Sequence, residues 1–220
     1  MNTLMMPAAA ACFNQGTLEL YQPPRPEEAA LRALMGRRTE FKDMIQAETR
    51  RIEHASLKAV RVSLESHLAA LKGQLALIEK DIRALTRRDE AFNHQSRLMQ
   101  TLAGIGAVAS QTILAFLPEL GHVPSATAVA LAGLAPYDRD SGKERGKRRI
   151  FGGRGQIGAC LYMAALAAIR SHAHFREFAE RLTRKGKPFK VAVTAVMRKL
   201  IVILSAMIRN GQPWKHAQTA

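Results

Sequence analysis

The sequence contains little cysteine, and this scarcity excludes two kinds of protein. Cys12 and Cys160 are its two cysteines, and they form no spaced pair. Cysteine-based zinc sites need closely spaced ligands, and disulfide-stabilised secreted domains need several cysteines. His172 and His174 have no cluster of histidine or cysteine beside them, so we expect a surface pair. The sequence therefore predicts a protein of a reducing compartment that has no metal site of its own.

Signals for secretion or membrane insertion are also missing. Residues 1–13 are mildly apolar, without the basic start and long apolar core of a signal peptide. The most apolar stretch, residues 191–208, is interrupted by Arg198 and Lys199, and charge at mid-span is costly in a bilayer. We expect a cytoplasmic protein with no membrane partner, in which this stretch is a buried helix with a cationic edge.

Acidic residues are scarce in one half of the chain. Residues 1–95 hold 14 Lys and Arg against 12 Asp and Glu, whereas residues 96–220 hold 19 against 6, a net charge of +13. A basic surface can serve solubility alone, but this asymmetry favours binding of a polyanion. Such binding releases counterions and weakens steeply with salt.

The densest cationic stretch lies between Gly133 and Arg154 and contains one hydroxyl nucleophile, Ser141. Its glycines interrupt regular helix and let backbone N–H groups approach an anion. This pattern indicates a serine presented to a phosphodiester in a cationic loop. The cations that follow the serine are Lys143, Arg145, Lys147, Arg148, Arg149 and Arg154.

No strand pattern of any length appears, so the predicted fold class is all-α. We divide the chain into an irregular segment (residues 1–22), a helical hairpin (residues 23–95) and a compact helical domain (residues 96–220). The first helix of the hairpin is predicted to end near His54. The second carries an apolar heptad seam, which is typical of a coiled coil. The seam can fold back on the first helix or pair with another subunit, and we expect self-association through it. Its members are Leu64, Leu68, Leu71, Leu75, Ile78, Ile82 and Leu85.

The compact domain is predicted to begin with a helix-hairpin-helix. A helix to residue 101, a tight turn at Gly104 and Gly106, and a helix to residue 117 would bring backbone amides and a helix N-terminus to a DNA phosphate. A short helix capped by Ser125 and reaching residue 134 should follow. Three further helices are expected at residues 156–170, 175–183 and 189–209.

Four blocks of this half resemble the transposase domain of DEDD-type insertion-sequence transposases, the bridge-RNA-guided recombinases. The resemblance covers residues 97–214. The blocks are Leu102-Ala-Gly-Ile-Gly, Gly133-Leu-Ala-Pro through Ser141-Gly142, Gly152-Gly-Arg with Leu161-Tyr-Met-Ala-Ala, and Lys185-Gly-Lys-Pro through Val196-Met-Arg-Lys-Leu, completed by Gly211-Gln-Pro-Trp214.

The resemblance implies a division of labour. In that family an N-terminal RuvC-like domain holds four metal-binding acids, and the C-terminal domain supplies a serine that links covalently to DNA. Ser141 falls at the matching position. No such acidic quartet occurs in this sequence, so we expect a truncated copy that needs no cofactor of its own, with Mg²⁺ entering only through a RuvC-like domain. DNA and a guide RNA are the implied partners, and the bacterial nucleoid is the implied location.

Three functions remain to be distinguished. The first is a transposase or recombinase of a mobile element, which acts by DNA binding and serine-nucleophile strand exchange. The second is a non-catalytic DNA- or RNA-binding helical protein in which Ser141 is a loop residue. The third, a structural coiled-coil protein, accounts for residues 60–90 but not for the charge asymmetry.

Overall fold

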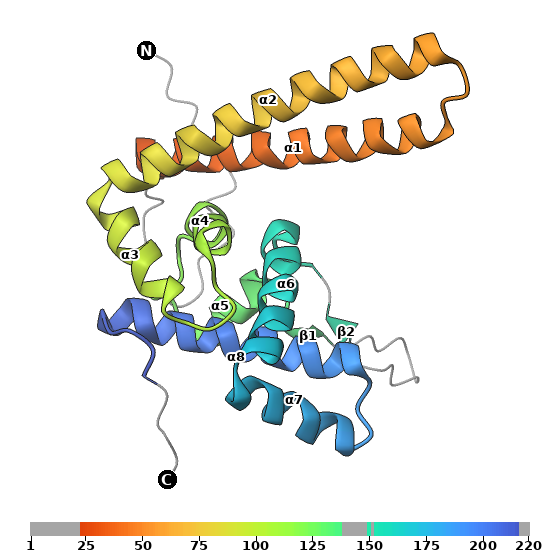
Figure 1. The fold of residues 1–220 in the computed structure, drawn as a ribbon. Helices are drawn as coiled ribbons and strands as arrows, with labels where there is room; N and C mark the ends of the chain where they lie inside the picture. The colour runs from red at the N-terminus through yellow and green to blue at the C-terminus, as the bar shows by residue number, and fades with distance from the viewer. Residues whose placement is uncertain (1–22, 138–148, 151, 216–220) are drawn as a thin grey trace, which may run out of the picture.

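A computed structural model describes residues 23–137, 149–150 and 152–215, and these residues form an all-α fold, as predicted (Figure 1). Eight helices and one small ribbon make up the described part of the chain. The ribbon consists of β1 (Pro136–Tyr137) and β2 (Arg149–Ile150). We found no strand pattern in the sequence because two-residue strands are too short to show alternation.

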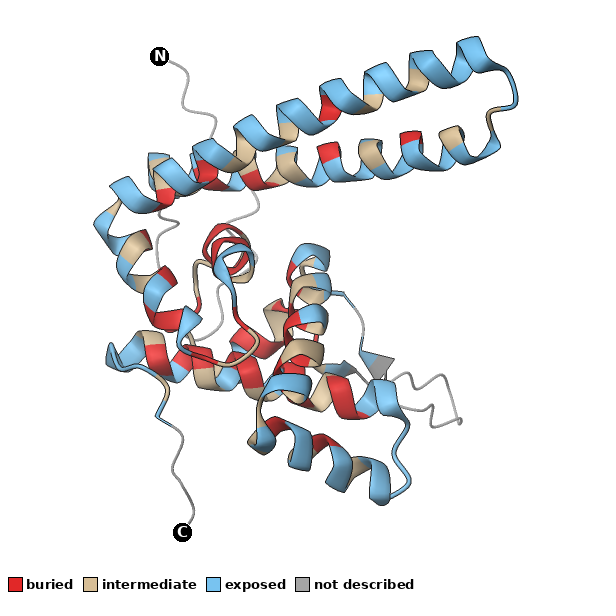
Figure 2. Cartoon of the chain, viewed as in Figure 1, coloured by how far each residue is buried: buried red, intermediate tan, exposed pale blue. Residues whose placement is uncertain are grey.

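A long antiparallel hairpin of α1 (Pro26–His54) and α2 (Lys58–Arg88) projects from the rest of the molecule (Figure 1). Leu71 and Ile82 are buried, and the other seam positions of α2 are half-buried. This helix packs against α1, in which apolar side chains such as Met35 and Phe41 are also buried. The seam is therefore occupied within the chain, and self-association stays a prediction. The outer faces of both helices are exposed (Figure 2).

The compact domain is built around its last helix, α8 (Phe189–Asn210). Four helices contact α8, namely α3 (Glu90–Gln100), α5 (Ser125–Leu131), α6 (Gly155–Ser171) and α7 (Ala173–Arg184), whereas α4 (Ala107–Phe116) packs on α1, α3 and α6. Among the described residues, α8 alone is long and apolar enough to cross a membrane. Its apolar face is instead covered by protein, since Val196, Leu200 and Leu204 are fully buried.

Two local predictions were wrong. The short helix α5 ends at Leu131 and not at residue 134, because Gly133 adopts a left-handed φ of 73° that ends the helical path. Pro124 occupies the N-cap position, and no side chain caps this helix, so Ser125 is its first helical residue and not its cap.

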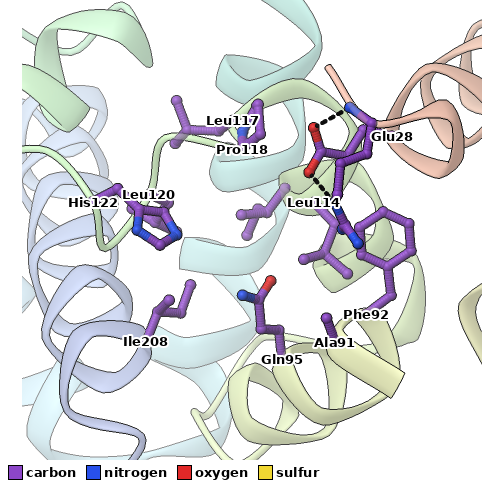
Figure 3. A pocket seen from close by; sticks show the side chains of 12 residues that line it. Glu28, Ala91, Phe92, Gln95, Leu114, Leu117, Pro118, Leu120, His122 and Ile208 are labelled. Atoms are coloured by element: carbon purple, nitrogen blue, oxygen red, sulfur yellow. Dashed lines mark hydrogen bonds and ion pairs between the residues drawn. The ribbon is translucent and has the colours of Figure 1, made fainter. Parts of the chain in front are cut away.

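The hairpin joins the compact domain at the N-terminal end of α1. Glu28 forms a capping box with Arg25, accepting bonds from its backbone N (3.2 Å) and its Nε (2.8 Å) (Figure 3). The Arg25 guanidinium also lies 5.1 Å from the centre of the Phe92 ring. A cavity of about 240 Å³ lies at this joint, and Gln95 and His122 line it together with Arg25 and Glu28 (Figure 3). The joint thus mixes apolar packing with a few polar contacts.

Candidate nucleic-acid interface

The ribbon lies at the base of the cationic loop. β1 and β2 pair antiparallel, with Pro136 opposite Ile150 and Tyr137 opposite Arg149. The segment between the two strands therefore begins and ends at positions that are paired with each other. Five predicted site residues lie outside the described residues, and the structure does not place them: Ser141, Lys143, Arg145, Lys147 and Arg148.

Below the ribbon the two arms of the chain cross at three glycines. Gly133, Gly152 and Gly153 have φ angles of 73°, 75° and 77°, in the left-handed region that favours glycine. A Cβ on Gly153 would collide with the backbone of Gly133, and a Cβ on Gly133 would collide with the carbonyl of Gly152. From the sequence we assigned these glycines to the approach of an anion. The structure gives them another task, which is to let two backbones touch, and we call this crossing the glycine clasp.

Arg154 fixes the second arm to the domain. Its guanidinium donates to both carboxylate oxygens of Glu119 and to the carbonyl of Phe116, each at 2.7 Å. Its backbone N–H donates to the carbonyl of Leu131 at 3.1 Å. The hydrogen bonds from Arg154 lower the pKa of Glu119, and those to Glu119 raise the pKa of Arg154. Arg154 therefore has a structural role, and its predicted contact with DNA stays a prediction.

A groove of about 500 Å³ separates the ribbon from α8. Pro136 and Ile150 line it on the ribbon side, and Lys190, Thr194 and Arg198 line it on α8. The latter three are spaced i, i+4 and i+8, which places them on one face of a helix. The sequence predicted a cationic edge on this helix, but we did not recognise that these three residues share one face. The groove brings two cations beside the base of the predicted loop.

The turn between α3 and α4 is the second predicted phosphate contact. Gly104 has a φ of 88°, and a Cβ there would collide with the carbonyl of Ala164 and crowd Ala168 on α6. Gly106 begins α4 with an extended φ of −95° and has open space where a Cβ would lie. Packing therefore explains Gly104, whereas Gly106 lies where a ligand can approach. The helix-hairpin-helix role of both stays a prediction.

Buried polar contacts hold this turn in place. The hydroxyls of Ser96 on α3 and Ser110 on α4 are 2.8 Å apart, and Gln100 donates to the Ser96 hydroxyl at 2.9 Å. Buried polar groups that satisfy one another fix the geometry of the elements that carry them. The two helices are therefore positioned by a network that the sequence pattern did not reveal.

The chain after α8 returns to the same turn. The backbone N–H of Trp214 donates to the Thr101 hydroxyl at 3.3 Å, and the Trp214 ring stacks on buried Phe175 at 5.5 Å. His172 lies 4.9 Å from the Trp214 ring and accepts from the backbone N–H of His174 as the cap of α7. Both histidines are half-buried, and His172 has a local role that the sequence did not predict, as a helix cap that packs on tryptophan.

The described residues offer neither a metal cluster nor an activated thiol. No three His, Cys, Asp or Glu side chains gather there in a way that could hold a metal ion. Burial raises the pKa of the Cys160 thiol, which keeps it neutral and a poor nucleophile. The part of the compact domain that the structure describes thus provides cations and backbone amides.

The helices of the compact domain thus carry a two-stranded ribbon with two cations of α8 beside it. Residues 96–180 match the family described as Transposase IS116/IS110/IS902. These residues are therefore similar to the transposase domain of this family, and the resemblance found in the sequence is confirmed.

Curated relatives agree with this assignment. The pilin gene-inverting proteins of Moraxella bovis and Moraxella lacunata are each 29% identical over 199 residues, which cover 89% of this chain and 62% of theirs. The 43.6 kDa protein of insertion element IS110 from Streptomyces coelicolor is 28% identical over 71% of this chain and 38% of its own length. The chain therefore spans less than two thirds of the length of these relatives.

Proposed function

We propose that this chain binds DNA in the transposition or inversion reaction of a mobile element and that Ser141 is the nucleophile. The observation that carries the proposal is the clasped ribbon, which lies beside Lys190 and Arg198 and from which the segment containing Ser141 begins and ends. The transposase family and the gene-inverting relatives support the same reaction class.

The chemistry is a phosphoryl transfer. The Ser141 oxygen attacks a backbone phosphorus, its proton passes to a base, and the bond from phosphorus to one deoxyribose oxygen breaks as that oxygen gains a proton. Charge develops on the phosphoryl oxygens, and nearby guanidinium groups stabilise it. Among the described residues, no cluster of His, Cys, Asp or Glu fits a resident metal ion. Following the resemblance, we propose that Mg²⁺ acts only on a RuvC-like domain.

The first test is DNA binding by the chain, measured by fluorescence anisotropy over a salt series. We expect log affinity to fall linearly with log salt at a slope of about −0.9 per neutralised phosphate. The origin of the expected slope is the net charge of +13 in residues 96–220. A flat response would remove DNA binding from the proposal.

The second test is a covalent adduct that survives detergent. We expect wild type to form it with duplex DNA when a RuvC-like domain and Mg²⁺ are supplied, and Ser141→Ala to lose it while retaining binding. Ser171→Ala is the matched control, because Ser171 is an exposed serine at the end of α6. An adduct formed by the Ser141→Ala protein would identify another nucleophile.

The same experiment separates the alternative function. A non-catalytic DNA- or RNA-binding protein would show salt-dependent binding and no adduct under any condition. A guide RNA and a second copy of the chain are partners that we propose on the resemblance alone. We propose the bacterial cytoplasm, at the nucleoid, as the place of action, since the relatives come from bacteria and two of them are named gene-inverting proteins.

A further inference from the structure

A second group of cations gathers where α7 packs on α8, outside the ribbon groove. Arg181, Arg184 and Lys199, here called the α7–α8 cluster, line a cavity of about 420 Å³. The Arg181 guanidinium lies 5.4 Å from the centre of the Phe178 ring, and the Lys199 ammonium lies 4.7 Å from it. Two like charges therefore share one aromatic side chain.

Cations outnumber carboxylates in this cavity, since three cations and one carboxylate, Glu177, line it. Within the residues that the structure describes, no carboxylate forms an ion pair with any of the three cations. Burial, and then the charge of Arg181, lower the pKa of Lys199. Residues 173–199 hold eight Lys and Arg against two Asp and Glu, so the surroundings add to the repulsion. A cavity lined by mutually repelling cations is typical of a binding site for a negative ligand.

Helix capping explains only part of the cluster. Arg181 and Arg184 lie in or near the last turn of α7, where cations are favoured by the helix carbonyls. Lys199 lies in the middle of α8, half-buried, where no helix end accounts for it. The ring of Phe178 already contacts two cations, so it is not offered to an unpaired base for stacking. The cluster therefore suits a backbone phosphate of duplex DNA better than a single-stranded nucleic acid.

We propose that the α7–α8 cluster binds a backbone phosphate of duplex DNA, as an anchoring site separate from the loop that carries Ser141. The inference rests on the DNA-binding part of the proposed function. Arg198 lines the ribbon groove and Lys199 lines the cluster, so consecutive residues of α8 face the two sites. A single rigid helix then fixes the spacing between the anchoring phosphate and the phosphates near the ribbon.

The test compares two variants with equal loss of charge in the full chain. Arg181→Gln, Arg184→Gln and Lys199→Gln remove the cluster. Exposed hairpin cations provide the matched control, changed as Arg50→Gln, Lys72→Gln and Arg83→Gln. On a duplex the cluster variant should reduce the salt slope by about 1 to 2, the equivalent of one or two phosphate contacts, and the control should not change it.

The outcomes separate this inference from the proposed function. If wild type does not bind duplex DNA, both are overturned. If wild type binds and the cluster variant keeps its slope, only the anchoring site is overturned. A reduced slope on an RNA hairpin but not on the DNA duplex would also overturn it.

A second variant, which should gain affinity, tests the site even if the triple variant misfolds. Glu177 is exposed, and it is the one carboxylate among the residues that line the cavity. Glu177→Gln removes a charge that opposes a phosphate, and we expect about twofold tighter duplex binding at low salt with unchanged helicity. The matched control is Glu180→Gln, an exposed carboxylate of α7 outside the cavity lining. Unchanged or weaker binding by Glu177→Gln would contradict the proposal.

Discussion

The hairpin and the compact domain are both helical, but they reach stability in different ways. Each hairpin helix buries one apolar stripe and leaves the rest exposed, whereas α8 is covered by four helices (Figures 1 and 2). The hairpin has nearly equal numbers of acidic and basic residues, and some of them form ion pairs between its helices, such as Arg38 with Glu79 at 2.9 Å. Every glycine with positive φ among the described residues lies in the compact domain. An apolar repeat is thus enough to specify a projecting helical hairpin. The ribbon site also needs close contacts between backbones, which glycine permits.

The largest expected effect is the opening of the hairpin. Leu71→Asp with Leu75→Asp places two carboxylates in the seam, and we expect the free energy of unfolding of the hairpin to fall by about 4 kcal/mol or more. Limited proteolysis should cut α1 and α2 while the compact domain survives. Leu77→Asp is the control, because Leu77 is 59% exposed on the same helix. Resistance of the double variant to protease would contradict the packing of the seam.

The next effect tests the backbone contacts of the compact domain. Gly104→Ala forces a side chain into a left-handed conformation and against α6, so we expect a loss of about 2–5 kcal/mol in the free energy of unfolding. Gly106→Ala has open space and an extended φ, so we expect a loss under about 1 kcal/mol. Urea unfolding followed by circular dichroism measures both. Equal losses would show that the turn does not pack on α6.

The smallest effect concerns the Arg154–Glu119 pair. Both partners are about one third exposed, so solvent screens the pair, and Arg154→Ala should cost about 1–2 kcal/mol at neutral pH. The folded-state pKa of Glu119 is below its ordinary value of 4.5, so the contribution is present above pH 4.5. It is lost as pH falls through the lower, folded-state pKa.

The pH series supplies the check on that pair. The difference in unfolding free energy between wild type and Arg154→Ala should shrink in acid, because protonation of Glu119 removes the ion pair from wild type as well. Arg170→Ala is the control, since Arg170 is an exposed cation of α6. A difference that stays constant down to pH 3 would show that Glu119 is not the partner that matters.

Much of the fold could be predicted because it follows from apolar periodicity. The heptad spacing located α2, and the glycines near residue 105 located the turn between α3 and α4. The cap of α5 and the setting of His172 could not be predicted in this way. The first is a local choice between two adjacent residues that apolar spacing does not resolve. The second depends on the return of Trp214, far along the chain, to the α3–α4 turn.

The site was predictable in composition but not in the roles of its residues. Charge counting located the basic region, and the family resemblance selected Ser141. Sequence alone did not show that Arg154 is bonded to Glu119 or that Gly133 and Gly153 touch. A sequence does not distinguish a structural cation from a ligand-binding one. The difference depends on whether a carboxylate lies beside the cation in the folded protein.

The glycine clasp has a consequence for how this domain can change over evolutionary time. Because Gly133 and Gly153 touch below the ribbon and the two strands pair, the two arms are fixed to each other on both sides of the ribbon. Insertions and replacements between residues 137 and 149 carry little folding penalty, since loop length affects stability only weakly. The clasp thus lets the segment between the strands change in length while the two arms that hold it stay in register.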